Sequence, residues 1–335
     1  MEYRGVGRSG LVVSEIALGS GSATFVGRAD DDEAIRIVRH ARDLGITYFD
    51  TAETYAEGRA ETVFGRALGK ERGDVVIATK FGKDRSVGKD VAPGSRRNVF
   101  RAVEGSLRRL ATDYIDLYIF HMPDPRTPIE ETLSALDDLV RSGKVRYVGC
   151  SDFTAWETVE AGWTAKTQHL EPFITAGTEY NLLNRDAERE LIPSCHAYGV
   201  GLVPTFPLAG GFLSGKYQRG QERPAGSRFA TVPAMADAKF QRLSRYDARL
   251  SDENFRALDA LTEFASNRGH TIVELAFAWL LSKPEVAAVP VGVTSEAQLT
   301  ANVRGLGWHL TAPDLVEIDG LLASAVANQD LQNSG

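Results

Sequence analysis

Residues 114–120 read Tyr-Ile-Asp-Leu-Tyr-Ile-Phe, a run in which apolar and aromatic residues hardly alternate with polar ones. Residues 74–79, Asp-Val-Val-Ile-Ala-Thr, have the same character. A strand with one face in water alternates every second residue, whereas a parallel strand covered by helices on both faces does not. These two stretches therefore predict buried strands of a parallel sheet.

Similar short apolar runs recur along the chain and alternate with segments of helical period. In the helical segments apolar residues lie three and four apart, as at Ala34, Ile37, Val38 and Ala41. This alternation predicts repeated strand–helix units. The predicted strands are residues 15–18, 46–49, 75–79, 114–120, 145–148, 173–176, 200–203 and 286–289. Further helices are predicted around residues 99–110 and 129–140, from residue 251 onward, and at 296–305 and 313–325.

Eight strand–helix units close most naturally into a (β/α)8 TIM barrel, of class α/β. A chain of 335 residues could form two ordinary domains or one large barrel. Because no Pro/Gly/Ser-rich linker divides it, we predict a single domain over residues 1–335.

Three additions to a minimal barrel are predicted. Residues 3–13 contain a turn-like Ser9-Gly10 between apolar pieces, and we expect a hairpin that plugs the barrel floor. Residues 204–250 form a long segment after the seventh strand, a length typical of functional lids or disorder. An extra C-terminal helix follows Thr311, a residue suited to an N-cap, and is expected to pack outside the barrel.

Composition and charge exclude several classes of protein. The chain is 43% hydrophobic and 25% charged, an ordinary globular balance, and its net charge of −7 disfavours nucleic-acid and anionic-membrane partners. Cys150 and Cys195 are too few for a disulfide framework or a four-thiolate zinc site, so we expect buried thiols and no metal. The first ten residues lack the apolar core of a signal peptide, and no apolar run approaches the ~20 residues of a membrane span. A soluble, cytoplasmic protein is predicted.

Three predicted strands end in a polar residue with acid–base chemistry. Asp50 follows the second strand, Lys80 the third and His121 the fourth, and the period of two places each on one face of its strand. In barrels the active site lies where strands end at the carboxyl face. If these faces point inward, the three side chains meet at one mouth, with Tyr55 in the loop after Asp50.

Each of these residues taken alone also has a structural interpretation. Asp50 and Lys80 could form a purely structural ion pair. His121 could be a hydrogen-bonded core histidine, and Tyr55 a packing aromatic. Their joint occurrence at the ends of successive strands favours the catalytic interpretation.

The four residue types fit proton donation to a carbonyl oxygen. A tyrosine has an unperturbed pKa near ~10, and a neighbouring ammonium such as that of Lys80 lowers it. Asp50 would hold Lys80 protonated, and His121 would donate a hydrogen bond to the substrate oxygen. Since none of these residues can supply hydride, a reduced nicotinamide is required.

Several longer motifs surround these positions. The stretches are Phe-Asp-Thr-Ala-Glu-Thr-Tyr at 49–55, Ala-Thr-Lys at 78–80, Asp-Leu-Tyr-Ile-Phe-His at 116–121, Gly-Cys-Ser-Asp-Phe at 149–153 and Pro-Leu-Ala-Gly-Gly-Phe-Leu-Ser-Gly-Lys-Tyr at 207–217. With them the chain resembles the aldo-keto reductase family from residue 8 almost to its end. The resemblance implies a reductase of aldehydes and ketones that uses NADPH, with NADH as a possible substitute. The family's tetrad maps onto Asp50, Tyr55, Lys80 and His121.

The resemblance also implies a cofactor site and a substrate site. The glycine-rich stretch at 207–217 could approach a pyrophosphate closely, and the alternative is a mobile turn. Loop residues 20–30 and 204–250 would frame the substrate, with Phe25, Tyr55, His121 and Met122 beside it. The implied cofactor residues are Gly19, Ser20, Ser151, Asp152, Gly177, Thr205, Phe206, Leu208, Gly210, Leu213, Ser214, Gly215, Lys216, Gly292, Val293, Thr294, Gln298 and Asn302.

Four positions depart from the family pattern. Gly177 stands where relatives carry Gln, and Thr205 where many carry a Tyr that stacks on the nicotinamide ring. Asp152 replaces the usual Asn after Ser151, and Thr294 stands where many relatives offer Ser, Lys or Arg to the 2′-phosphate. Gly177 and Thr205 also remove bulk beside the expected ring, which could widen the substrate site, shift the ring or mark a protein that has lost efficient hydride transfer.

Three functions are compatible with these observations. The first is an oxidoreductase that transfers hydride from NADPH to an aldehyde, ketone or keto-sugar, with Tyr55 as proton donor. The second is a cofactor-bound regulatory or interaction protein, resembling the potassium-channel β-subunits that share this barrel. The third is a non-redox lyase or dehydratase that uses Tyr55 and Lys80 as acid and base. The substrate and the oligomeric state stay open.

Overall fold

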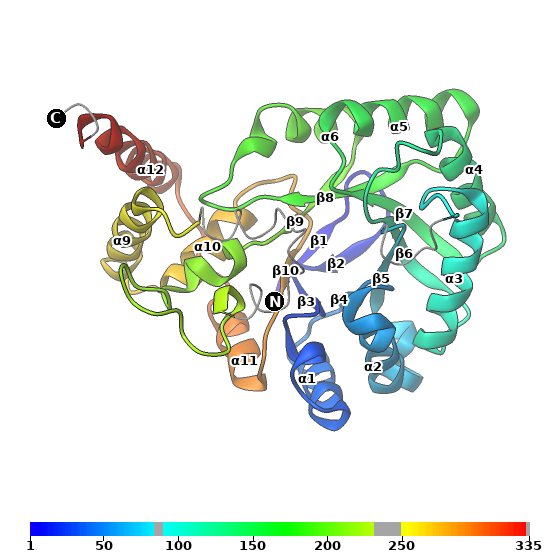
Figure 1. Ribbon diagram of the computed structural model, residues 1–335, viewed down its shortest axis with the longest axis horizontal. Helices are drawn as coiled ribbons and strands as arrows, with labels where there is room; N and C mark the ends of the chain where they lie inside the picture. The colour runs from blue at the N-terminus through cyan, green and yellow to red at the C-terminus, as the bar shows by residue number, and fades with distance from the viewer. Residues whose placement is uncertain (84–89, 231–248, 333–335) are drawn as a thin grey trace. The chain divides into compact units, whose positions relative to one another are not determined.

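The computed structural model describes residues 1–83, 90–230 and 249–332 (Figure 1). Its contacts group the chain into two compact units. The first consists of Met1–Thr178, Asp186–Thr205 and Pro284–Val303, and the second of Glu179–Arg185, Phe206–Lys283 and Arg304–Gly335. One domain over the whole chain stays a prediction, and each unit is described by itself below.

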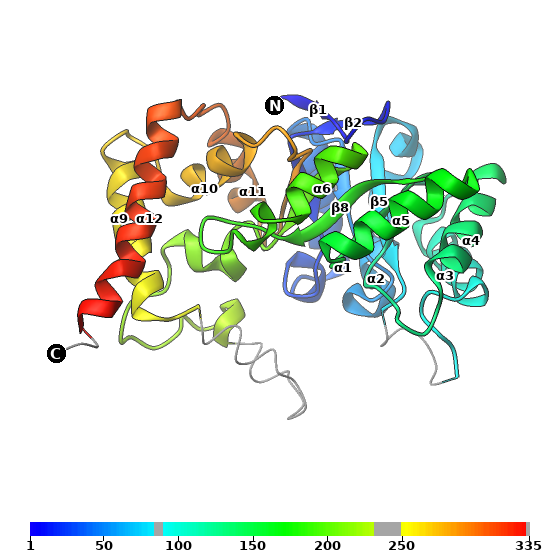
Figure 2. The same cartoon turned by 90° about the horizontal axis from the view of Figure 1, so that it is seen from above.

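Among the described residues, the first unit carries an eight-stranded parallel sheet that forms a nearly closed barrel (Figures 1 and 2). The strand order is β10-β3-β4-β5-β6-β7-β8-β9, and a parallel bridge from Leu202 to Val286 links the two edges. The predicted (β/α)8 barrel is therefore confirmed. The strands are β3 Ile16–Gly19, β4 Tyr48–Asp50, β5 Val76–Phe81, β6 Ile115–Phe120, β7 Val145–Ser151, β8 Phe173–Glu179, β9 Gly201–Thr205 and β10 Val289–Val291.

Helices α1 to α6 of the first unit lie between successive strands and α11 follows β10. Capping side chains mark where some of them begin. Asp30 accepts a hydrogen bond from the amide of Glu33, and Thr154 forms a capping box with Glu157. The α-helices are α1 Asp31–Asp43, α2 Arg59–Leu68, α3 Arg96–Leu110, α4 Ile129–Arg141, α5 Ala155–Gln168, α6 Leu191–Tyr198 and α11 Glu296–Arg304. Short 3-10 turns are η1 Phe25–Gly27, η2 Tyr55–Gly58, η3 Gly69–Asp74 and η5 Asp186–Glu188.

The predicted N-terminal hairpin is present. Strand β1, Tyr3–Gly5, pairs antiparallel with β2, Val12–Ser14. Val6 and Val13 are buried in the same apolar cluster as the inward residues of the barrel, and Val76 at the start of β5 packs against that cluster. The hairpin therefore closes the amino end of the barrel.

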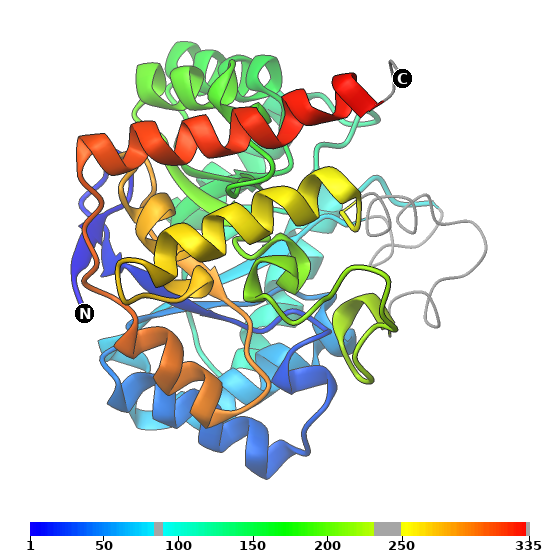
Figure 3. The same ribbon diagram turned by 90° about the vertical axis from the view of Figure 1, so that its left-hand side faces the viewer.

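The second unit is helical. It contains η6 Ala209–Ser214, α9 Asp252–Ser266, α10 Ile272–Leu281 and α12 Ala312–Gln332. Helices α9 and α12 pack side by side, as Figure 3 shows in yellow and red. The predicted helix starts are confirmed, since Ser251 caps α9 and Thr311 exchanges hydrogen bonds with Asp314 in the first turn of α12. None of the described helices is long and apolar enough to cross a membrane.

Some boundaries differ from the prediction. The strand predicted at 46–49 is Tyr48–Asp50. The strand predicted at 286–289 is Val289–Val291, and Val286 makes only an isolated bridge to Leu202. Helix α2 is absent from the sequence-based prediction, although its buried residues have helical spacing. Within the long segment predicted at 204–250, residues 231–248 lie outside the described part of the chain.

Candidate active site

Three neighbouring strands bring the predicted acid, base and imidazole to one end of the barrel. Asp50 ends β4, Lys80 lies one residue before the end of β5, and His121 directly follows β6. Tyr48, Ala78 and Ile119 each lie two positions before one of these three residues, and all three belong to the buried apolar core of the barrel. The predicted parity is thus confirmed, and the three side chains share one face.

Asp50 and Lys80 form a buried ion pair. The Nζ atom of Lys80 lies 2.7 Å from both carboxylate oxygens of Asp50 and 2.9 Å from the carbonyl oxygen of Thr51. Burial is the largest single effect and would lower the pKa of Lys80, but the charges of Asp50 and Tyr55 and the hydrogen bonds to both residues together outweigh it, so the pKa is raised. The lysine is therefore held as an ammonium.

Tyr55 lies between the ammonium and the imidazole. The Nζ atom of Lys80 is 5.2 Å from the centre of the Tyr55 ring, and the ring of His121 packs edge-on against it at 5.9 Å between centroids. His121 is itself buried, and its amide donates to the carbonyl oxygen of Phe81 at 2.8 Å. The structure thus brings the four residues of the predicted tetrad together.

The backbone after Tyr55 is strained. Ala56 and Glu57 have φ angles of 46° and 56°, the left-handed region that is costly for residues with a side chain, and Gly58 follows at 88°. The amide of Ala56 donates to the hydroxyl of Ser22 at 3.0 Å. Such a turn persists only where the surroundings hold it, and strained turns are common at functional sites.

The other two predicted substrate residues lie in different environments. The side chain of Phe25 is fully buried, and its amide donates to the carbonyl oxygen of Val293. Met122 follows His121 and is 39% exposed. Of Phe25 and Met122, only Met122 therefore has an accessible side chain that a ligand could contact.

Small polar residues lie near the carboxyl ends of β7 and β8, where the nicotinamide end of a cofactor is predicted. Asp152 has a φ of 56°, which Asp and Asn tolerate better than most residues, and its amide donates to the carbonyl oxygen of Gly177 at 2.7 Å. A Cβ atom on Gly177 would lie only 3.1 Å from the Ser151 hydroxyl. Any residue larger than glycine at position 177 would therefore crowd the side chain of Ser151.

Other predicted cofactor residues of the first unit lie on β3 and after β10. Gly19 pairs with Asp50 in the sheet, and Ser20 donates its amide and hydroxyl to the carbonyl oxygen of Asp50. The side-chain oxygen of Gln298 accepts hydrogen bonds from the amide and hydroxyl of Thr294. Gly292 and Val293 directly precede Thr294, and Asn302 lies on α11 and is half-buried. This set of hydroxyls, amides and backbone fits an uncharged or polar part of a dinucleotide.

The glycine-rich segment belongs to the second unit. Gly210, Gly211 and Gly215 have φ angles of 73°, 97° and 73°, so the loop needs glycine there. Phe206 also has a positive φ, and the Ser214 hydroxyl donates to the carbonyl oxygen of Gly211. The cofactor role of this segment, from Phe206 through Leu208 and Leu213 to Lys216, stays a prediction.

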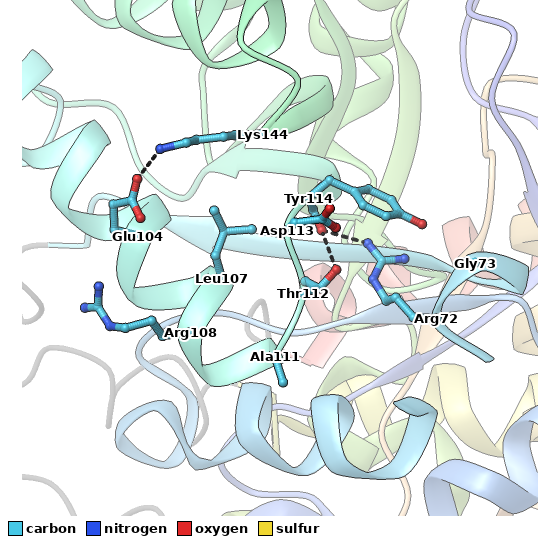
Figure 4. Close-up of a pocket in the computed structure, with 10 residues that line it drawn as sticks. All are labelled: Arg72, Gly73, Glu104, Leu107, Arg108, Ala111, Thr112, Asp113, Tyr114 and Lys144. Atoms are coloured by element: carbon cyan, nitrogen blue, oxygen red, sulfur yellow. Dashed lines mark hydrogen bonds and ion pairs between the residues drawn. The ribbon is translucent and has the colours of Figure 1, made fainter. Parts of the chain in front are cut away.

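A separate pocket of about 860 Å³ lies at the opposite end of the barrel (Figure 4). Arg72, Tyr114 and Lys144 on its wall precede β5, β6 and β7, whereas the tetrad lies where strands end. The lining residues are Arg72, Gly73, Glu104, Leu107, Arg108, Ala111, Thr112, Asp113, Tyr114 and Lys144.

Comparison with known proteins defines the class of this protein. Residues 15–323 match the model of the aldo/keto reductase family, so the chain belongs to this family of oxidoreductases, whose members use nicotinamide cofactors. It is 37% identical over 324 residues to a probable voltage-gated potassium channel subunit beta of Oryza sativa subsp. japonica, with 95% of each chain covered. It is 35% identical to versiconal hemiacetal acetate reductase of Aspergillus parasiticus, covering 94% of this chain and 95% of that one. It is 34% identical to L-glyceraldehyde 3-phosphate reductase of Escherichia coli (strain K12), covering 98% and 94%.

One group beside the site is absent from the sequence-based prediction. Glu61 is fully buried on α2 and contacts Thr79 on β5 and Arg109 on α3. A glutamate at a buried position of the helical pattern between Ala60 and Phe64 is the signal that could have pointed to it.

Proposed function

We propose that this protein transfers hydride from NADPH to the carbonyl of an aldehyde, ketone or keto-sugar, with Tyr55 as the proton donor. The observation that carries the proposal is the cluster of Tyr55, Lys80, Asp50 and His121 at the ends of three adjacent strands. The names of the two reductase relatives, from Aspergillus parasiticus and Escherichia coli, support the same class of reaction.

Each side chain has a distinct role in this proposal. The hydroxyl of Tyr55 donates its proton to the carbonyl oxygen, and the fixed ammonium of Lys80 favours the phenolate that remains. Asp50 keeps that ammonium charged and in place. His121 donates a hydrogen bond to the same carbonyl oxygen and so stabilises the negative charge that develops there.

The reduced nicotinamide, when bound, supplies the hydride. Ser151, Asp152 and Gly177 would hold its nicotinamide end, and Thr294, Gln298 and Asn302 its adenosine end. The remaining proposed contacts in the first unit are Gly19, Ser20, Thr205, Gly292 and Val293. NADH is the alternative cofactor, because Thr294 offers no cation to a 2′-phosphate.

The test is turnover by the purified protein with NADPH and a panel of aldehydes, ketones and keto-sugars, followed by nicotinamide absorbance. We expect Tyr55→Phe and Lys80→Met each to lower kcat by at least about 100-fold, the usual contribution of a general acid. Tyr198→Phe, at a 37% exposed tyrosine of α6, is the matched control and should leave kcat unchanged. Undiminished turnover by Tyr55→Phe would refute the proton-donor assignment, and substrate loss without an absorbance change would indicate lyase chemistry.

The similarity to the probable voltage-gated potassium channel subunits beta of Oryza sativa and Arabidopsis thaliana, at 37% and 36% identity, supports a second candidate. In that case the protein binds a nicotinamide cofactor and acts through a partner. Slow turnover with every carbonyl tested, together with NADPH that stays bound through gel filtration, would favour this function over the first.

A further inference from the structure

A buried polar network lies directly behind the proposed site. Glu61 on α2 is fully buried, and its Oε1 accepts a hydrogen bond of 2.6 Å from the hydroxyl of Thr79 on β5. Its Oε2 accepts a hydrogen bond of 2.6 Å from Nε of Arg109 on α3. A buried carboxylate is costly unless it is paired and hydrogen-bonded, so this network joins three elements at one point.

One face of α2 is shaped around the end of α3. A Cβ atom on Gly58 would lie 2.8 Å from Cδ of Arg109, and one on Gly65 would lie 2.4 Å from the carbonyl oxygen of Leu110. Positions 58, 61 and 65 are three and four apart and so share a helix face. The absence of side chains at the two glycines thus leaves room for the end of α3, so that the Arg109 side chain can reach Glu61.

The network is connected through the backbone to two residues of the tetrad. Thr79 immediately precedes Lys80 on β5. Gly58 ends the strained turn that begins at Tyr55. A turn with successive positive φ angles needs external support, and the Arg109 side chain packed on Gly58 supplies it from one side.

We propose that the Glu61–Arg109 ion pair positions Tyr55 against Lys80, so that the two residues are positioning residues for proton donation. The inference rests on the proposed function. It gives a role to a carboxylate that is fully buried and is paired with an arginine that is 32% exposed.

The first test separates kcat from KM. Since a misplacement of about 1 Å can cost up to about 100-fold in rate, Arg109→Ala should lower kcat by at least roughly 10-fold and leave KM for NADPH nearly unchanged. Arg109→Lys, which keeps the charge, should recover part of the loss. The control is Arg72→Ala, which breaks the ion pair with Asp116, 13% and 14% exposed, at the opposite end of the barrel. We expect it to lower stability without lowering kcat.

The second test does not depend on turnover. The alkaline titration of phenolate absorbance in the wild type, minus that of Tyr55→Phe, isolates the ionisation of Tyr55. Among the described residues, Lys80 and His121 lie beside this ring, and Asp50 is paired with Lys80. Moving the ring away from the ammonium of Lys80 should shift the Tyr55 midpoint to higher pH in Arg109→Ala, and Arg72→Ala should not shift it.

The outcomes distinguish the two proposals. If the wild type reduces no carbonyl, the proposed function fails, and the Tyr55 midpoint still tests the positioning role. If Arg109→Ala and Arg72→Ala change kcat and the midpoint equally, the Glu61–Arg109 pair is only structural and the inference is overturned. Should Arg109→Ala not fold, Arg109→Lys and Thr79→Val are measured in the same way, and an unchanged midpoint in both would overturn it.

Discussion

The ammonium nitrogen of Lys80 lies 2.7 Å from each of the two carboxylate oxygens of Asp50. The side chains are only 6% and 11% exposed, so solvent screens this pair weakly. In such a place removing one partner leaves an uncompensated charge, which costs far more than the loss of a surface pair. The pair is therefore a structural requirement of the barrel as well as part of the proposed chemistry.

The first prediction concerns Asp50→Asn. Without the carboxylate, burial dominates and disfavours the Lys80 ammonium, so the variant should be about 3–5 kcal/mol less stable near neutral pH. The wild-type pKa of Lys80 is raised, so the stabilisation by the pair is complete below the ordinary lysine pKa of about 10.4 and is lost as the pH rises through the folded value. Urea unfolding should therefore show a gap between wild type and variant that narrows at alkaline pH.

The control for Asp50→Asn is Asp138→Asn, which breaks the exposed ion pair with Arg96. Surface pairs contribute about 0–1 kcal/mol, so its effect should be small at every pH. A gap for Asp50→Asn that stays the same from neutral to strongly alkaline pH would contradict the coupling between the two buried groups.

The second prediction concerns Gly58→Ala. Its φ of 88° costs an alanine about 1–2 kcal/mol, and the contact of 2.8 Å with Arg109 adds about 1–3 kcal/mol of overpacking. Gly143→Ala is the matched control, because its φ is 76° but its Cβ would meet the nearest atom only at 3.6 Å. Equilibrium unfolding should give a larger loss at Gly58 than at Gly143. Equal losses would show that Arg109 gives way freely.

The third prediction concerns Asp152→Asn. Its φ of 56° suits both residues, so the free energy of unfolding should change by less than about 0.5 kcal/mol. An amide can donate a hydrogen bond to a cofactor where a carboxylate cannot, and a hydrogen bond contributes about 1 kcal/mol. We expect NADPH to bind several-fold more tightly, as measured by its fluorescence. Glu160→Gln, the same loss of charge on an exposed part of α5, should leave the affinity unchanged.

The fourth prediction concerns the two thiols. Burial raises the pKa of Cys195 to about 11 and that of Cys150 well above its ordinary range. At mildly alkaline pH neither should therefore react with a disulfide reagent in the native protein, since the thiolate is the nucleophile. Both should react in denaturant. Fast labelling of either cysteine in the folded protein would contradict its burial.

The sequence predicts those parts of the site that depend on local periodicity. Strands have a period of two, so the inward direction of Asp50 and Lys80 follows from their neighbours once the strands are recognised. The helix start at Ser251 and the N-cap Thr311 are local as well, and both are confirmed. The tetrad could thus be assembled from strand ends and one loop residue.

Other features depend on contacts that no local pattern encodes. The contact of Arg109 with Glu61 and Gly58 joins residues about fifty positions apart on two helices, and only the packing of α2 against α3 creates it. The grouping of the chain into two units is another such feature. The chain passes from the first unit to the second at Glu179 and again at Phe206, and no linker-like composition marks either position in the sequence.

The hairpin at the barrel floor has a consequence for how the chain folds during synthesis. Its Gly7 fits against the backbone of Gly199 and Gly201, and the Arg4 guanidinium donates to the carbonyl oxygen of Val286. This hydrogen bond joins residues 282 positions apart in the sequence, so it can form only after both have been synthesised. Docking of the hairpin therefore depends on contacts of high sequence separation, which slow folding. Its apolar residues Val6 and Val13 stay uncovered until the inward residues of the barrel are in place.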